Sequence, residues 1–237
     1  MSNNKVFIIA EVGINHNGNF DLAIKMIQEA KNSGADAVKF QTFKVEAVLL
    51  NPQKIDYAWE LSYEQTRKLK KYADKIGIEF ISSPFDPDSC TFLHKIGVKR
   101  TKIPSGELVN PFMLEAAANT KLPLIISTGT ATIDEVKLTV NYLKKLGSTD
   151  ISILHCTTQY PTQLANCNIL AIRHLQREIK LPIGFSDHTE GINVAISAVT
   201  LGAKIIEKHF TTDKNLPGPD QKTSLEPDTF RALVNNI

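Results

Sequence analysis

Short apolar runs recur along the chain, and each run ends in polar or ionisable residues. The runs are rich in valine and isoleucine and continuously apolar, which is typical of strands buried on both faces of a parallel sheet. They cover residues 6–10, 37–40, 78–81, 100–103, 122–126, 151–154, 181–185 and 204–206. Helical stretches separate these eight runs, so the pattern predicts an α/β fold, a (β/α)8 TIM barrel with its active site at the carboxyl ends of the strands.

Three of the predicted helices begin and end at recognisable signals. They are bounded by Asn19 and Gly34, by Ser62 and Gly77, and by Thr132 and Gly147. Gln65 and Glu135 follow Ser62 and Thr132 by three residues and complete capping-box patterns, while glycine commonly ends a helix. Shorter helices are predicted near residues 88–96, 111–118, 168–179 and 191–201.

Two long segments interrupt this rhythm, residues 42–61 and residues 211–226. Long loops on the catalytic face of a barrel commonly serve as lids or substrate contacts. The last predicted helix starts near Pro227, a favourable first helical residue, and has about three turns before Ile237. We therefore expect a single catalytic barrel over residues 1–237, with a truncated final helix.

Charge and composition exclude several classes of partner. The net charge is only +2 and no Lys/Arg block occurs, so neither a nucleic-acid nor a membrane partner is expected. No apolar run approaches the roughly 18 residues that span a bilayer. The three cysteines follow no zinc or redox spacing, and no signal-peptide pattern opens the chain, which together predict a cytoplasmic protein.

Polar pairs with a two-residue spacing mark several strand ends. The pairs are Lys39 with Gln41, Ser186 with His188, Glu207 with His209 and, just past the fourth strand, Ser105 with Glu107. Residues i and i+2 of a strand share a face, so both members of a pair face the same way. Solvated loops explain one such pair equally well, but repetition at the same end of the strands indicates a common site.

His188 and His209 end strands seven and eight, which are neighbours in a barrel. Two imidazoles on adjacent strand ends can bind one divalent ion and leave positions for water and substrate. Imidazole with oxygen ligands suits Mn, Fe, Co or Zn, with Mg as a further candidate. The alternative is two ordinary hydrogen-bonding histidines. Asp187 is expected to orient one of the ligands.

A second set of residues points to an anion. Two ammonium groups with several hydroxyls suit a phosphate, or a phosphate with a carboxylate. The set comprises Lys39, Lys102, Ser105, Ser127 and Ser186. The alternative is that the lysines pair with Glu11 or Glu107. Either carboxylate could instead act as a general base, if burial raises its pKa. His155 is expected to be a packed core residue, and His94 and His174 surface residues.

Nine stretches of the sequence resemble the sialic acid synthase family, in the order that the family has them. They are IIAEVGINHNGN (8–19), GADAVKFQTFK (34–44), FISSPFD (80–86), KIPSGEL (102–108), IISTGTATIDE (125–135), ILHCTTQYPT (153–162), GFSDHTEG (184–191), IEKHFT (206–211) and PGPDQKTSLEPDTF (217–230). The resemblance implies condensation of phosphoenolpyruvate with an N-acylmannosamine-type sugar, which gives a sialic acid-type nonulosonate, such as N-acetylneuraminate or a legionaminate or pseudaminate relative, and phosphate.

The resemblance also implies roles for individual residues. His188 and His209 would hold the divalent metal, Mn²⁺ in preference to Mg²⁺ or Co²⁺. Phosphoenolpyruvate would contact Lys39, Gln41, Ser83, Lys102, Ser105, Ser127 and Ser186. Glu11 would be the catalytic acid/base, and Glu107, the second catalytic candidate, would face the amino sugar together with Thr158, Tyr160 and Asp220.

The sequence also departs from the family pattern. Thr130 stands where members commonly have methionine, and Thr158 where some have asparagine, which leaves the exact sugar open. Members usually carry a C-terminal antifreeze-like domain, which is absent from this chain; a homodimer is expected if the full-length protein has it. The alternatives are another phosphoenolpyruvate–aldose synthase, or a truncated, catalytically silent barrel that binds an anion or sugar.

Overall fold

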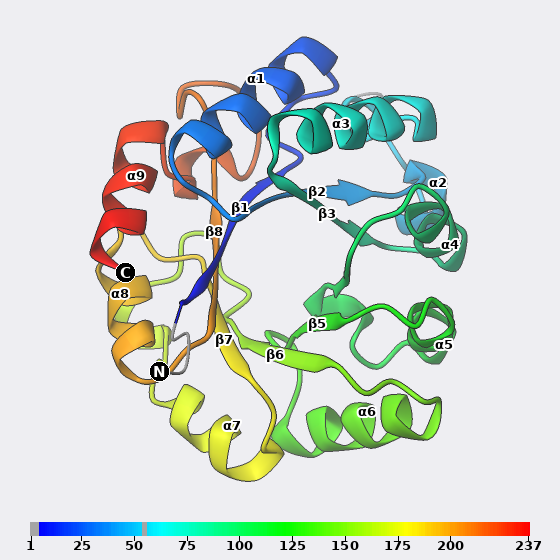
Figure 1. The fold of residues 1–237 in the computed structure, drawn as a ribbon, viewed down its shortest axis with the longest axis vertical. Coiled ribbons are helices and arrows are strands. Elements are labelled where there is room, and N and C mark those ends of the chain that lie inside the picture. Colours follow the sequence, from blue (N-terminus) through cyan, green and yellow to red (C-terminus); the bar gives the residue numbers. More distant parts are fainter. Residues whose placement is uncertain (1–4, 54–55) are drawn as a thin grey trace.

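The eight predicted strands form one parallel sheet that curves into a barrel, with helices packed around its outside (Figure 1). The computed structural model describes residues 5–53 and 56–237. The strands are β1 (Phe7–Gly13), β2 (Ala37–Thr42), β3 (Glu79–Pro84), β4 (Thr101–Ile103), β5 (Leu124–Ser127), β6 (Ile151–His155), β7 (Ile183–Asp187) and β8 (Ile205–His209). The predicted TIM barrel is confirmed, and every strand except β4 extends into the polar residues that follow its apolar run.

Hydrogen-bonded pairing runs in the order β3-β2-β1-β8-β7-β6-β5-β4. The first and last strands of the chain therefore lie side by side, as a barrel requires. β3 and β4 are also neighbours in space, but within residues 5–53 and 56–237 no ladder joins them. The barrel is thus nearly closed, with its one seam beside the short strand β4.

The outer helices match the sequence prediction in place and in their starting signals. They are α1 (Phe20–Asn32), α3 (Tyr63–Ile76), α4 (Pro87–Lys95), α5 (Pro111–Asn119), α6 (Ile133–Lys145), α7 (Ala171–Ile179), α8 (Asn193–Thr200) and α9 (Pro227–Asn236). Asn19 caps α1, and Ser62 and Thr132 form complete capping boxes with Gln65 and Glu135. None of the described helices is both long and apolar enough to cross a membrane.

Short helical pieces occupy several of the loops. The segment 42–61 contains α2 (Val45–Val48) and the 3-10 helix η1 (Asp56–Trp59), neither of which the sequence pattern predicts. The other 3-10 helices are η2 (Ser105–Glu107), η3 (Leu164–Asn166) and η4 (Gln221–Thr223). Both η2 and η4 follow the carboxyl end of a strand, so they contribute to the same face of the barrel.

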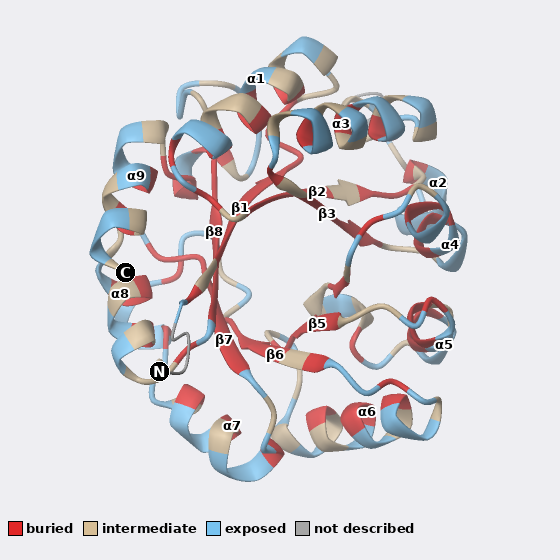
Figure 2. Cartoon of the chain, viewed as in Figure 1, coloured by how far each residue is buried: buried red, intermediate tan, exposed pale blue. Residues whose placement is uncertain are grey.

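The strands are buried along most of their length, whereas each helix buries only its inner side (Figure 2). Inside the barrel, one layer of apolar side chains fills the centre: Ile9, Ala37, Ile81, Ile125, Leu154 and Ile205. Two residues further along each of these strands comes a residue on the same face. Those residues are Glu11, Lys39, Ser83, Ser127, Cys156 and Glu207. A polar layer therefore lies directly on the apolar layer, at the carboxyl end of the barrel.

Candidate active site

The polar layer forms the floor of a cavity of about 400 Å³. Thirteen of the fourteen residues predicted from the sequence as site residues line it: Glu11, Lys39, Gln41, Ser83, Lys102, Ser105, Ser127, Thr158, Tyr160, Ser186, His188, His209 and Asp220. They come from every strand or from the loop that follows it. The cavity thus gathers residues that lie as far as 209 positions apart in the sequence, from Glu11 to Asp220.

Glu107 is the one predicted site residue that the structure does not bring into this lining. β4 ends at Ile103, and the chain then turns into η2, so the two-residue strand spacing does not continue from Ser105 to Glu107. The carboxylate of Glu107 is half-buried and accepts a hydrogen bond of 2.6 Å from the Asn110 side-chain amide.

Two lysines and two carboxylates meet at the cavity floor, each of them nearly fully buried. The sheet register sets Glu11 opposite Lys39, and Lys39 Nζ lies 2.8 Å from Glu11 Oε2. Glu207 lies 3.7 Å from both Lys39 Nζ and Lys102 Nζ. The pairing of Lys39 with Glu11 was one of the alternatives left open by the sequence, whereas Lys102 pairs with Glu207 and not with Glu107. The two positive charges of the lysines and the two negative charges of the ionised carboxylates therefore cancel.

The two carboxylates differ in proton affinity. Burial, supported by the nearby charge of Glu207, outweighs Lys39 and raises the pKa of Glu11 to about 7. Burial also acts to raise the pKa of Glu207, but there Lys102 and Lys39 outweigh it and the pKa falls below its ordinary value. Glu207 is therefore the permanent anion of the cluster, and Glu11 is the carboxylate that exchanges a proton near neutral pH.

Serine hydroxyls surround the two ammonium groups. Lys102 Nζ donates to Ser127 Oγ at 2.7 Å, and Lys39 Nζ donates to Ser83 Oγ at 3.2 Å. Ser186 Oγ donates to Glu207 Oε1 at 2.9 Å, since the sheet register pairs these two residues. Lysine ammonium groups beside several hydroxyls can bind phosphate and carboxylate oxygens.

Gly129 lies behind the cavity wall, against the lining residues Ser105, Cys156 and Thr158. Its backbone N–H donates to Ser105 Oγ at 2.9 Å. A Cβ atom at this position would lie 2.5 Å from Thr158 Oγ1 and 2.8 Å from Cys156 Sγ, distances shorter than van der Waals contact. Only glycine allows the backbone to approach the cavity so closely.

His188 and His209 face each other across the cavity with their ring centroids 5.5 Å apart. Burial and the proximity of His209 lower the pKa of His188 to about 4, and burial and Lys39 lower that of His209 to about 3. Both imidazoles are therefore neutral at pH 7, the form that binds a metal. His188 Nδ1 lies 2.7 Å from the Thr157 carbonyl oxygen, so Nδ1 carries the proton and the lone pair is on Nε2, which lies 3.3 Å from Ser186 Oγ.

The environment of His209 fits a divalent cation. Its Nδ1 atom is buried and, within the described chain, has no hydrogen-bond partner. The nearest carboxylate oxygen to it is Asp220 Oδ2, at 3.7 Å. An orphaned buried nitrogen costs free energy unless a ligand completes it. The described residues include no cluster of three His, Cys, Asp or Glu side chains that could hold a metal ion by themselves.

The prediction that Asp187 orients a ligand histidine by accepting a hydrogen bond from it is wrong. Asp187 faces away from the cavity, where its carboxylate binds Lys208 and Thr189. The Thr157 carbonyl contacts His188 instead. The three other histidines assessed from the sequence lie as expected: His155 is buried against the Cys167 carbonyl, and His94 and His174 are exposed.

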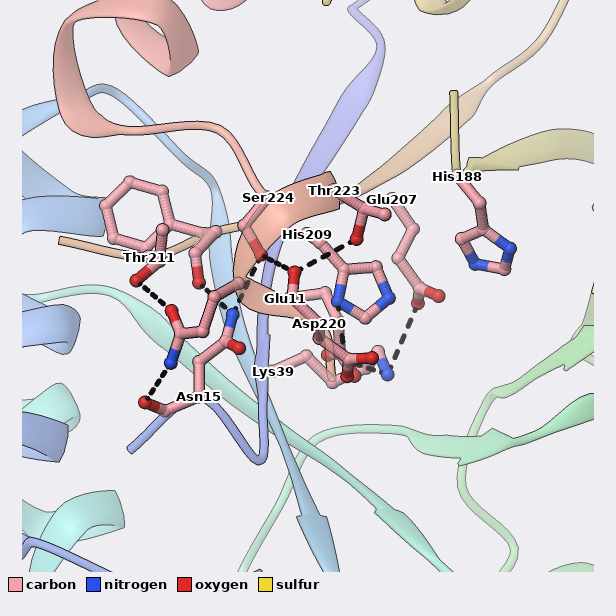
Figure 3. A network of polar contacts seen from close by, with 12 residues as sticks. Glu11, Asn15, Lys39, His188, Glu207, His209, Thr211, Asp220, Thr223 and Ser224 are labelled. Carbon is pink, nitrogen blue, oxygen red and sulfur yellow. Dashed lines mark hydrogen bonds and ion pairs between the residues drawn. The ribbon is translucent and has the colours of Figure 1, made fainter. Parts of the chain in front are cut away.

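Tyr160 and Asp220 border the outer part of the cavity. The Tyr160 ring stacks on His188 at a centroid distance of 4.2 Å and meets His209 edge-on. Asp220 lies in the loop after β8, which buried amides attach to the loop after β1 (Figure 3). Asn15 Nδ2 donates to Ser224 Oγ at 2.8 Å, and Gln221 Nε2 donates to the Asn15 carbonyl at 2.9 Å. This network holds Asp220 beside His209.

Six further residues, to which the sequence assigned no role in the site, line the cavity: Phe85, Pro104, Gly106, Thr130, Cys156 and Glu207. Glu207 matters most, because it contacts both lysines. Its two-residue spacing from His209 already marks it as a residue of the common site, but the spacing does not show that it contacts the lysines.

Comparisons of the sequence and of the structure with known proteins point to one family of enzymes. The NeuB family profile matches residues 26–237. The N,N'-diacetyllegionaminic acid synthase of Legionella pneumophila is 45% identical over 252 residues, which cover 98% of this chain and 71% of that protein. The human N-acetylneuraminate-9-phosphate synthase is 37% identical over 248 residues, with 98% and 69% covered. The crystal structure of an N-acetylneuraminic acid synthetase from Leptospira borgpetersenii, in complex with citrate, is 38% identical, has a TM-score of 0.95 and is covered over 86% of its chain.

Proposed function

This chain belongs to the NeuB family, and from that premise we propose that it condenses phosphoenolpyruvate with an N-acylmannosamine-type sugar to give a sialic acid-type nonulosonate and inorganic phosphate. It is a sialic acid synthase-type enzyme, a transferase that forms a carbon–carbon bond. The legionaminic acid and N-acetylneuraminate synthases among its relatives support this class of product. For the sugar substrate, we propose the class of N-acylmannosamine-type sugars.

One observation carries the proposal: the cavity combines an anion-binding side with two neutral imidazoles and one carboxylate that titrates near pH 7. Phosphoenolpyruvate is a small anion with a carboxylate and a phosphate. Lys39 and Lys102 would each bind one of its anionic groups, and Ser83, Ser105, Ser127 and Ser186 would donate hydrogen bonds. Protonation of Glu11 on binding would offset part of the added negative charge.

His188 and His209 would hold a divalent cation, with Mn²⁺ as our first candidate. The orphaned Nδ1 atom of His209 and the lone pair of His188 Nε2 fit such an ion. When bound, the ion would supply Lewis-acid polarisation of a substrate oxygen.

The reaction joins C3 of phosphoenolpyruvate to the aldehyde carbon of the open-chain sugar. As this bond forms, the protonated Glu11 donates its proton to the aldehyde oxygen. Positive charge develops at C2, water adds there, and the ionised Glu11 accepts the proton that the water loses. The resulting tetrahedral centre collapses to the ketone as its C–O bond to phosphate breaks and its hydroxyl proton passes to the departing phosphate. Lys39, Lys102 and the serines would stabilise the departing phosphate. Holding the two substrates together could supply roughly 7–11 kcal/mol of the barrier reduction.

The outer part of the cavity would receive the amino sugar. Tyr160 presents an aromatic ring and a hydroxyl, and Asp220 presents a carboxylate that can accept hydrogen bonds from sugar hydroxyls. Thr158, which also lines the cavity, would contact the substituent that distinguishes one N-acyl sugar from another.

The test is phosphate release from phosphoenolpyruvate, measured with Mn²⁺ and a panel of N-acyl hexosamines and phosphorylated aldoses. We expect release only with an N-acylmannosamine-type sugar, together with a nonulosonate detected by mass spectrometry. The Glu11→Gln variant controls for contaminating phosphatase. Release that requires a phosphorylated aldose, or no release with any sugar, would contradict the proposal.

A further inference from the structure

A fully buried ion pair lies on the outer face of the sheet, directly behind the two histidines. Lys208 Nζ lies 3.0 Å from Asp187 Oδ2, and both side chains are completely shielded from solvent. The sheet register pairs Asp187 of β7 with Lys208 of β8. His188 follows Asp187 and His209 follows Lys208 in the sequence, so the ion pair connects the two strand ends that carry the histidines.

The ion pair also holds the turn that follows β7. Asp187 Oδ1 accepts hydrogen bonds from the Thr189 N–H at 2.8 Å and from its hydroxyl at 2.7 Å. Lys208 Nζ donates to the Thr189 carbonyl. On the opposite side of β7, the Thr162 N–H donates to the His188 carbonyl at 2.8 Å. The backbone of His188 is thereby held between β8 and the loop that carries Tyr160.

The energetics of such a pair favour a geometric role over a stabilising one. Desolvation of two charges offsets most of their attraction, so buried ion pairs replaced by apolar residues often cost no stability. Their hydrogen bonds are directional, however, and fix the relative position of the groups that they join. Asp187 and Lys208 can therefore set the distance between two strand ends more narrowly than apolar packing would.

We propose that Asp187 and Lys208 are positioning residues that set the separation of His188 and His209 for a divalent cation. The inference rests on the proposed metal role of the two histidines. Neither positioning residue lines the cavity, so each would act only through the histidine next to it. Partners of this kind typically change metal affinity by about 10- to 100-fold when they are replaced.

The experiment titrates Mn²⁺ into the full chain by calorimetry, without substrates. Lys208→Met leaves the buried charge of Asp187 unpaired, so the double variant Asp187→Asn/Lys208→Met is the decisive one if the single variant does not fold. We expect the dissociation constant for Mn²⁺ to rise about 10- to 100-fold in the folded variant, while circular dichroism stays that of the wild type.

Arg100→Met is the matched control. Arg100 pairs with Glu79 at 2.6 Å near the opposite end of the barrel, so this change also removes an ion pair between strands but should leave Mn²⁺ affinity unchanged. A folded double variant that binds Mn²⁺ with wild-type affinity would overturn the positioning role of Asp187 and Lys208 but not the metal proposal. A wild-type chain that does not bind Mn²⁺ would overturn the metal proposal, and the inference with it.

Discussion

Glu11 and Lys39 form a buried ion pair of 2.8 Å, yet the pKa of Glu11 is raised to about 7. The main reason is burial, which penalises the ionised carboxylate, and the negative charge of Glu207, which Lys39 also faces, adds to this effect. The pair can therefore hold or release one proton near neutral pH without a large structural change. Such a group suits a reaction in which an anion binds and water is deprotonated.

Proton uptake by Glu11 should make phosphoenolpyruvate binding depend on pH. Below about pH 7, Glu11 is neutral and the cavity carries one more positive charge, so the KM for phosphoenolpyruvate should be lower than at pH 8. In Glu11→Gln this dependence should weaken, and kcat should fall about 10²- to 10⁴-fold because the general base is lost. Steady-state kinetics at several pH values measure both effects.

Phosphoenolpyruvate itself also changes its charge with pH, and it does so equally in assays of the wild type and of Glu11→Gln. The variant therefore serves as the control for the titration of the substrate. Parallel KM profiles for the two proteins would show that Glu11 does not exchange a proton on binding.

The same pKa shift predicts a pH-dependent stability difference. Folding raises the pKa of Glu11 from 4.5 to about 7, so the native state retains a proton that the unfolded chain releases. The contribution of Glu11 to stability therefore declines from pH 4.5 to pH 7, and glutamine has no such decline. When the pH is raised from 5 to 8, the free energy of unfolding of the wild type should therefore fall by about 2–3 kcal/mol more than that of Glu11→Gln. Urea unfolding at both pH values measures it, and a constant difference would contradict the raised pKa.

Replacement of Lys39 should affect phosphoenolpyruvate more than the sugar. Lys39→Met removes an ammonium group that would bind the anion, so the KM for phosphoenolpyruvate should rise about 10- to 100-fold, as expected for a lost charged hydrogen bond. Lys25→Met, at an exposed position of α1, is the control and should behave as wild type. An unchanged KM for phosphoenolpyruvate in Lys39→Met would remove this lysine from the anion site.

Loss of either candidate metal ligand should abolish metal-dependent condensation. His188→Ala and His209→Ala should fold, because each side chain ends at the cavity, but neither should regain activity when Mn²⁺ is added after chelator treatment. Chelator-treated wild type should regain it. His174→Ala, at an exposed position of α7, is the control. Full activity of either site variant in the presence of chelator would disprove the metal role.

The network that attaches the Asp220 loop should affect the sugar side selectively. Gln221→Ala removes the hydrogen bonds to the Asn15 carbonyl and to Thr211, and leaves buried partners unsatisfied. We expect a loss of about 1–3 kcal/mol in the free energy of unfolding and a KM for the sugar that rises more than that for phosphoenolpyruvate. Asn215→Ala, at an exposed position of the same loop, is the control. Equal changes in both KM values would argue against a role on the sugar side.

The sequence by itself determined the barrel and most of the cavity lining. Alternation along a strand is a local consequence of covalent geometry, so Glu11 must share the face of Ile9, and Lys39 that of Ala37, in any barrel that buries those apolar residues. The same rule failed for Glu107, because the strand ends at Ile103 and η2 changes the direction of the side chains.

Only the tertiary structure decided which charges meet. Glu207 contacts Lys39 and Lys102 from a strand that lies more than a hundred residues further along the chain, and Asp187 pairs with Lys208 on the outer face instead of accepting a hydrogen bond from a histidine. These distances depend on the register between neighbouring strands and on how the sheet curves closed. Neither is encoded in the period of any single strand. The composition of the site is therefore a local property of the sequence, whereas its pKa values and ion pairs are properties of the closed barrel.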